Sequence, residues 1–179
     1  MLRILNIITL MLVAYPVQAA ERVVIKTAEM KVSFNPRTAN QIGAFYEARG
    51  FPQAMRDVLR QQCFITVGIY NKSNKKIWLD MSHWKFTVDG KPVKREHRDT
   101  WKQRWQKMGV PLSKQSTFRW TLIPETLDYL PGEREGGNII LPFTDKRIGI
   151  TATFATGENK QGKKIVIRTD KLFCARDKE

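Results

Sequence analysis

Histidine, cysteine and acidic side chains are scarce in this chain, and each shortage excludes a class of protein. The 179 residues include only 2 His and 2 Cys, too few for a zinc ribbon, an iron–sulfur cluster or a three-histidine catalytic metal site. Against 31 Lys and Arg residues there are only 17 Asp and Glu residues, so the formal net charge is +14. The short length excludes a large multidomain enzyme and predicts a single domain.

Catalytic motifs are missing as well. The sequence contains no Gly-x-Ser-x-Gly elbow to present a nucleophilic serine. Its two cysteines are expected to be paired, which removes the thiol nucleophile. No two carboxylates stand in a recognisable catalytic context. The sequence therefore predicts a non-enzymatic protein without a cofactor.

Residues 1–19 have the pattern of a secretory signal peptide. Arg3 supplies the positive end, an apolar stretch follows, and Val17-Gln18-Ala19 is a small-residue cleavage site. A membrane anchor is the alternative, but the apolar run is roughly half the ~20 residues needed to cross a bilayer. We expect cleavage, export to the periplasm, and one mature β-rich domain over residues 20–179 with no transmembrane segment.

Cys63 and Cys174 form an even pair, as expected in an oxidising compartment. They predict a structural disulfide that ties the C-terminal end of the domain to the start of its first central strand. A redox-active pair is the alternative, but the two cysteines lack the Cys-x-x-Cys spacing of such sites.

Short alternating or β-branched stretches recur along the chain and predict a mainly β fold. Residues 22–34 suit a first strand or a strand pair, with Lys26 on the same parity as Met30 and Phe34. Further strands are expected at residues 64–70, 76–79, 84–88, 116–123, 138–141, 148–155 and 164–169. Turn signals near every ten residues favour an antiparallel β-sandwich or a partly open barrel.

Two or three short helices are expected to interrupt the sheets. Thr38 and Gln41 form a capping box at the start of the first helix, and Pro52 opens the second. A third helix over residues 98–108 carries Trp101 and Trp105 on one face. In contrast, residues 116–123 are expected as a strand with Phe118, Trp120 and Leu122 inward, and residues 125–137 as a mobile loop.

Residues 64–88 combine a strand, an Asn-x-Ser turn, a Trp-Leu strand and a strand that runs into Asp89-Gly90. This stretch, about a quarter of the chain, resembles the small immunoglobulin-like sandwich domains of bacterial envelope proteins. The resemblance implies an immunoglobulin-like β-sandwich and assigns no function, because such sandwiches have many roles.

The densest charge asymmetry lies in residues 91–107, the basic segment, which carries only two acidic residues. This segment is the predicted surface for an anionic envelope component or an acidic partner protein, with peripheral membrane contact as a further option. Nucleic acid is not expected as a partner of an exported protein. Core packing is the alternative role of the two tryptophans. The predicted binding residues are Lys91, Lys94, Arg95, Arg98, Trp101, Lys102, Arg104, Trp105 and Lys107.

Two other functions remain open at this point. Met81 and His83 are soft ligands of the kind that hold Cu(I), so a periplasmic copper-handling protein is an alternative. Two ligands are too few for a complete site, and methionine more often fills a core. An envelope-polymer hydrolase is a second alternative. The principal prediction is an exported accessory or binding protein with a basic, aromatic-containing face.

Overall fold

A computed structural model describes residues 21–177 of the chain, and the predicted signal peptide lies outside them. The fold is mainly β, as predicted, with ten strands and four short α-helices. In chain order the elements are β1 (Val23–Lys26), β2 (Met30–Arg37), α1 (Ala39–Glu47), α2 (Gln53–Arg60), β3 (Gln62–Asn71), β4 (Ile77–Asp80), the 3-10 helix η1 (Met81–His83), β5 (Lys85–Val88), β6 (Lys91–Val93), α3 (Arg98–Lys107), α4 (Leu112–Thr121), β7 (Thr126–Tyr129), β8 (Arg134–Pro142), β9 (Ile148–Thr156) and β10 (Ile165–Leu172).

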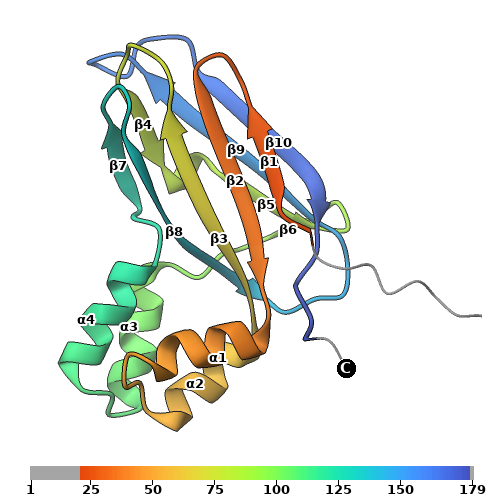
Figure 1. Cartoon of the computed structure of the whole chain (residues 1–179), viewed down its shortest axis with the longest axis vertical. Helices are drawn as coiled ribbons and strands as arrows, with labels where there is room; N and C mark the ends of the chain where they lie inside the picture. Colours follow the sequence, from red (N-terminus) through yellow and green to blue (C-terminus); the bar gives the residue numbers. More distant parts are fainter. Residues whose placement is uncertain (1–20, 178–179) are drawn as a thin grey trace, which may run out of the picture.

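The strands form two antiparallel sheets (Figure 1). One sheet has four strands in the order β1-β2-β3-β8. The other has six, in the order β6-β5-β9-β4-β7, with β10 paired to β9. Alternate residues of the strands point between the sheets, where Phe34, Ile65 and Phe154 are fully buried. The observed fold therefore agrees with a sandwich or an open barrel.

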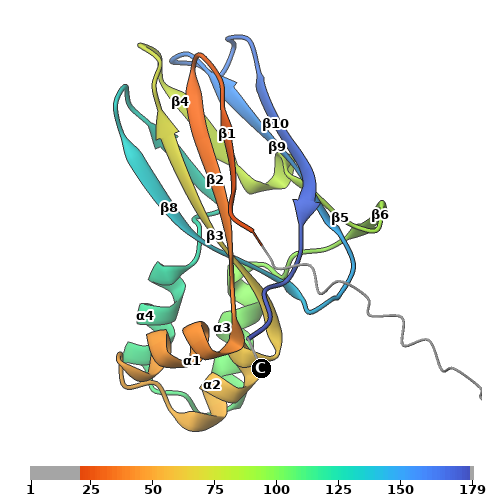
Figure 2. The ribbon, with the colours of Figure 1, turned by 45° about the vertical axis from the view of Figure 1, so that its right-hand side comes forward.

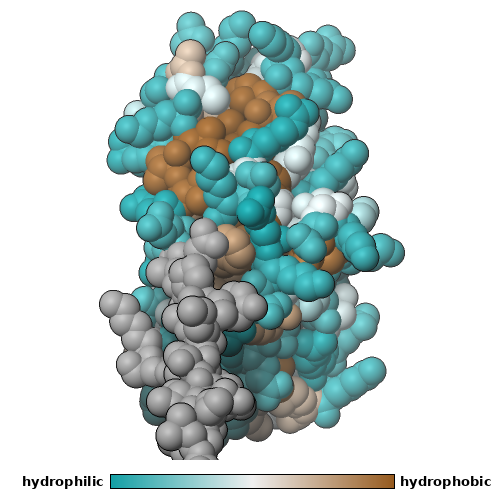
Figure 3. Space-filling view, turned by 90° about the vertical axis from the view of Figure 1, so that its right-hand side faces the viewer, coloured by the Kyte–Doolittle hydropathy of each residue, from teal (hydrophilic) through white to brown (hydrophobic). Residues whose placement is uncertain are grey.

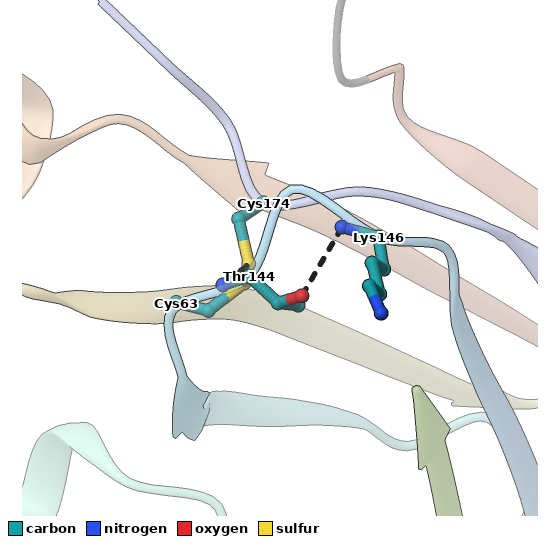
Figure 4. Close-up of a disulfide and its surroundings, with 4 residues drawn as sticks. All are labelled: Cys63, Thr144, Lys146 and Cys174. Atoms are coloured by element: carbon teal, nitrogen blue, oxygen red, sulfur yellow. Dashed lines mark hydrogen bonds between the residues drawn. A yellow bond between two sulfur atoms is a disulfide. The ribbon is translucent and has the colours of Figure 1, made fainter. Parts of the chain in front are cut away.

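Cys63 and Cys174 form the predicted disulfide, with Cα atoms 5.2 Å apart and a sequence separation of 111 residues. The bond joins β3 to the segment that follows β10 (Figure 4). Beside it, the backbone N–H of Thr144 donates to Cys174 Sγ at 3.4 Å. The Thr144 hydroxyl accepts in turn from the Lys146 N–H at 3.1 Å. The turn between β8 and β9 therefore packs against the disulfide.

All four α-helices gather at one end of the sandwich (Figures 1 and 2). Thr38 caps α1 as predicted: its hydroxyl accepts from the Gln41 N–H, and the Gln41 side chain accepts from the Thr38 N–H. The helices enclose a second hydrophobic core that includes Phe64 of β3 and Ile140 of β8. They therefore cover one end of the outer face of the four-stranded sheet.

The predicted strand at residues 116–123 is wrong, because this segment belongs largely to helix α4. Phe118 and Leu122 are both buried, but they are four residues apart and so share a helix face as well as a strand face. Trp120 lies between them in the sequence and is 83% exposed, not inward. The extra helix brings the number of α-helices to four instead of two or three.

The predicted loop at residues 125–137 is also wrong, because β7 lies within it and β8 begins in it, at Arg134. Residues 22–34 form a strand pair, and the turn between β1 and β2 reverses the parity that the sequence suggested. Lys26 is exposed, whereas Met30 and Phe34 are buried. Because of this reversal, Lys26 lies on the same face of the sheet as Lys31, directly opposite it.

Strands β1 and β10 lie on one side of the molecule, close together but without pairing. A hydrophobic area surrounded by hydrophilic residues is visible on this side (Figure 3). Val24 of β1 and Val166 of β10 are exposed hydrophobic residues of these two strands. Among the helices of residues 21–177, none has the length and apolar character needed to cross a membrane.

Candidate anion-binding surface

The outer face of the four-stranded sheet is built from alternate residues of its strands. On β2 these are Lys31, Ser33, Asn35 and Arg37, whose neighbours in the sequence are buried between the sheets. The register sets the partners across the sheet. Ser33 lies opposite Gly68 of β3, which lies opposite Gly136 of β8.

The two glycines leave the middle of this face without side chains. A Cβ atom on Gly136 would lie 2.2 Å from the carbonyl oxygen of Val67, and one on Gly68 would lie 3.0 Å from Ser33 Oγ. The result is a shallow hollow of about 750 Å³, which we call the basic trough. It is lined by Arg22, Lys26, Lys31, Ser33, Gly68, Ile69, Tyr70, Lys72, Arg134, Glu135 and Gly136.

Positive charge dominates the basic trough. Its lining includes five cationic side chains and a single carboxylate, that of Glu135. Among residues 21–177, none of the five cations forms a salt bridge. Their charge therefore remains available to an external anion.

Three of these cations lie in one row across the strands, which we call the basic row. Lys26 lies directly opposite Lys31, Lys31 opposite Tyr70, and Tyr70 opposite Arg134. Like charges directly opposite each other destabilise a sheet. The Lys26–Lys31 pair therefore destabilises the free protein by charge repulsion, which a bound anion would reduce.

Two further contacts hold cations in place in and beside the basic row. Lys72 Nζ donates to the carbonyl oxygen of Thr27 at 2.8 Å. The guanidinium carbon of Arg134 lies 4.1 Å from the centre of the Tyr70 ring, within cation–π distance. These contacts position the charges without neutralising them.

The basic segment, residues 91–107, does not form one continuous surface. Its first residues lie on the β5–β6 hairpin, which extends sideways from the sandwich, whereas α3 lies in the helical layer (Figure 2). Lys91, Lys94, Lys102 and Lys107 are exposed. The remaining predicted cations are the three partly buried arginines.

Those arginines are largely engaged by neighbouring groups. Arg95 forms a 2.5 Å salt bridge with Glu125, and Arg104 forms one of 2.7 Å with Glu96. Arg98 donates to the carbonyl oxygen of Arg119, and burial lowers the pKa of its guanidinium. The segment thus offers fewer free charges than its sequence suggests.

Trp101 and Trp105 are buried at 1% and 0% exposure. Their ring centres are 5.3 Å apart, and both rings contact Phe118 of α4. They pack in the helical core, so they cannot present their rings to a partner at the surface. The binding role of the exposed lysines in this segment stays a prediction.

Met81 and His83 are placed differently with respect to solvent. Met81 is 4% exposed in the sandwich core, whereas the His83 side chain is 60% exposed, with Nδ1 3.8 Å from Asp80. In the part of the chain from 21 to 177, no group of three or more His, Cys, Asp or Glu side chains is arranged to hold a metal ion. This geometry gives the copper alternative no additional support.

The sequence did not reveal the basic trough because its cations come from three separate parts of the chain, residues 22–31, Lys72 and Arg134. Lys26, Lys31 and Arg134 come together only through the register of β1, β2, β3 and β8. One signal was present: Lys31 and Ser33 alternate with buried apolar residues on β2.

No protein-family model matches the chain, and no curated protein matches it significantly.

Proposed function

We propose that the chain is a non-enzymatic, exported binding protein that holds an anionic component of the periplasmic envelope. The binding surface is the basic trough on the outer face of the four-stranded sheet. The observation that carries the proposal is the convergence there of five cations without a salt-bridge partner among residues 21–177.

The shape of the trough supports the same role. Its floor is backbone at Gly68 and Gly136, so a ligand can approach the sheet closely between the charged side chains. Three of the five cations, Lys26, Lys31 and Arg134, are carried by strands, so the hydrogen-bonded sheet fixes the backbone from which they project. Less backbone freedom is therefore lost on binding than in a site built on a mobile loop.

Two triple variants with the same loss of charge test this location. Lys26→Gln/Lys31→Gln/Arg134→Gln removes the basic row, whereas Lys94→Gln/Lys102→Gln/Lys107→Gln removes exposed lysines of the basic segment. Fluorescent dextran sulfate serves as the polyanionic probe, and its Kd is measured at low and at physiological ionic strength. The matched charge change separates a localised surface from a general effect of net charge.

We expect the basic-row variant to weaken binding about tenfold, since three exposed charge pairs at about 0.5 kcal/mol each amount to roughly 1.5 kcal/mol, and about 1.4 kcal/mol corresponds to a factor of ten. At physiological ionic strength the basic-segment variant should change Kd less than about threefold, because salt largely screens exposed charges that do not contact the ligand. An equal loss in the two variants, or a larger loss in the second, would contradict the proposed location.

A further inference from the structure

The basic trough continues toward the helical end of the molecule. A second hollow of about 550 Å³ shares Gly136 with it. Figures 1 and 2 show α1 and α4 at this end of β2, β3 and β8. We call the second hollow the aromatic end; it is lined by Arg37, Gln41, Ile42, Phe45, Thr66, Trp120, Thr121, Gly136, Gly137 and Asn138.

Trp120 is the prominent group of the aromatic end. It is carried by the last turn of α4 and is 83% exposed, whereas Trp101 and Trp105 are buried in the helical core. Phe45 of α1 lines the same hollow and is only partly buried. An indole ring offers a large flat apolar surface with a polar N–H at its edge, a combination common at binding surfaces.

A row of polar side chains crosses the floor of this hollow. Arg37 Nε donates to Thr66 Oγ1 at 3.0 Å, and the Thr66 hydroxyl donates to Asn138 Oδ1 at 2.9 Å. The three residues come from β2, β3 and β8, so the row is fixed by the sheet. The terminal amino groups of Arg37 make no hydrogen bond or salt bridge with other residues in the range 21–177.

We infer that the trough and its aromatic end together bind a segment of an acidic polysaccharide; this rests on the proposed function. A sugar ring packs its apolar face on Trp120, while a carboxylate on that sugar or its neighbour accepts from the planar guanidinium of Arg37. Further acidic groups along the chain contact the basic row. From Lys31 to Arg37 the strand spans ~20 Å at about 3.3 Å per residue, which suits an extended polymer.

Two other classes of polyanion fit the surface less well. Single-stranded nucleic acid binds to grooves with successive aromatic platforms. Here the ring of Tyr70 is covered by the Arg134 guanidinium at 4.1 Å, and the ring of Phe45 by the Arg49 guanidinium at 3.6 Å, so neither offers a second open face on that side. An acidic protein would require an apolar, well-packed interface centre, whereas Ser33, Gly68 and Gly136 form the middle of the trough.

The test combines a stacking variant with a control from the same helix. Trp120→Ala removes the exposed ring, and Leu112→Ala removes an exposed apolar side chain of α4 that does not line the aromatic end. The probes are a defined oligogalacturonate, which has carboxylated sugar rings, and inorganic polyphosphate, which has charge but no sugar. A single-stranded oligonucleotide is the third probe. Calorimetry gives the Kd values, and acrylamide quenching reports whether the probe shields Trp120.

We expect Trp120→Ala to weaken oligogalacturonate binding about tenfold, near the upper value for an aromatic contact, with polyphosphate binding unchanged. Leu112→Ala should change neither. In the wild-type protein, oligogalacturonate should reduce acrylamide quenching and polyphosphate should not.

If Trp120→Ala and Leu112→Ala bind oligogalacturonate equally while the basic-row variant is still weakened, the polysaccharide inference is wrong and anion binding stands. If Trp120→Ala weakens a single-stranded oligonucleotide more than oligogalacturonate, the ligand is a nucleic acid and the inference is again wrong. If neither oligogalacturonate nor polyphosphate binds the wild-type protein, the proposed function fails together with the inference.

Discussion

Tryptophan side chains occupy opposite environments within the helical layer of this protein. Trp105 is fully buried and meets Phe118 edge to face, whereas Trp120 is 83% exposed. Side-chain type alone does not separate these roles, because a buried and an exposed tryptophan are equally hydrophobic. The distinction follows from the helical period: Phe118 and Leu122 face the core, and the residue midway between them faces outward.

Substitution of the two tryptophans should therefore have different effects on stability. Trp105→Ala is expected to lower the free energy of unfolding by about 3–5 kcal/mol, the usual cost of a large aromatic cavity. Trp120→Ala should change it by less than about 0.5 kcal/mol, as for an exposed position. Chemical denaturation followed by far-UV circular dichroism measures both. A similar loss in the two variants would contradict the environments described.

At the scale of elements, residues that fix local structure by themselves were predictable. The capping box at Thr38 and the alternating pattern of β9 both gave the observed element. The start of β8, in contrast, contains Gly136 and Gly137, which have poor strand propensity and become a strand by pairing with β3. The basic trough has the same origin: it depends on the register between strands, which a single sequence does not state.

The cap of α1 gives a test at this scale. Thr38→Ala removes the hydroxyl that accepts from the Gln41 N–H, so we expect the free energy of unfolding to fall by about 1 kcal/mol. Thr38→Ser keeps a hydroxyl at the same position and should restore most of the loss. Guanidinium denaturation of the three proteins measures the differences. If the serine variant is as unstable as the alanine variant, the cap is not the cause.

At the scale of the whole molecule, the disulfide links the beginning of β3 to the segment after β10. This pairing was predictable because the chain offers only two cysteines. Its packing against the β8–β9 turn through Thr144 was not, since the contact depends on the folded arrangement of three segments. A cross-link over so long a loop restricts the unfolded chain strongly.

Removal of the cross-link should lower stability without changing the fold. The double variant Cys63→Ala/Cys174→Ala is expected to lose about 2–5 kcal/mol of unfolding free energy. Equilibrium denaturation of the variant, beside wild-type protein with and without reductant, measures this loss. Equal midpoints for reduced and oxidised wild-type protein would contradict a stabilising role.

The same bond turns residues 63–174 into a covalent ring, while β1, β2, α1 and α2 precede it in the chain. The exposed turn between β9 and β10 lies inside this ring. A protease that cuts once in that turn opens the ring but releases no fragment, because each new end remains attached through Cys63 or Cys174. Only a second cut within the ring, or a cut outside it, can detach a piece of the polypeptide. The protein can therefore be nicked at one of its most accessible turns and still remain a single covalent molecule.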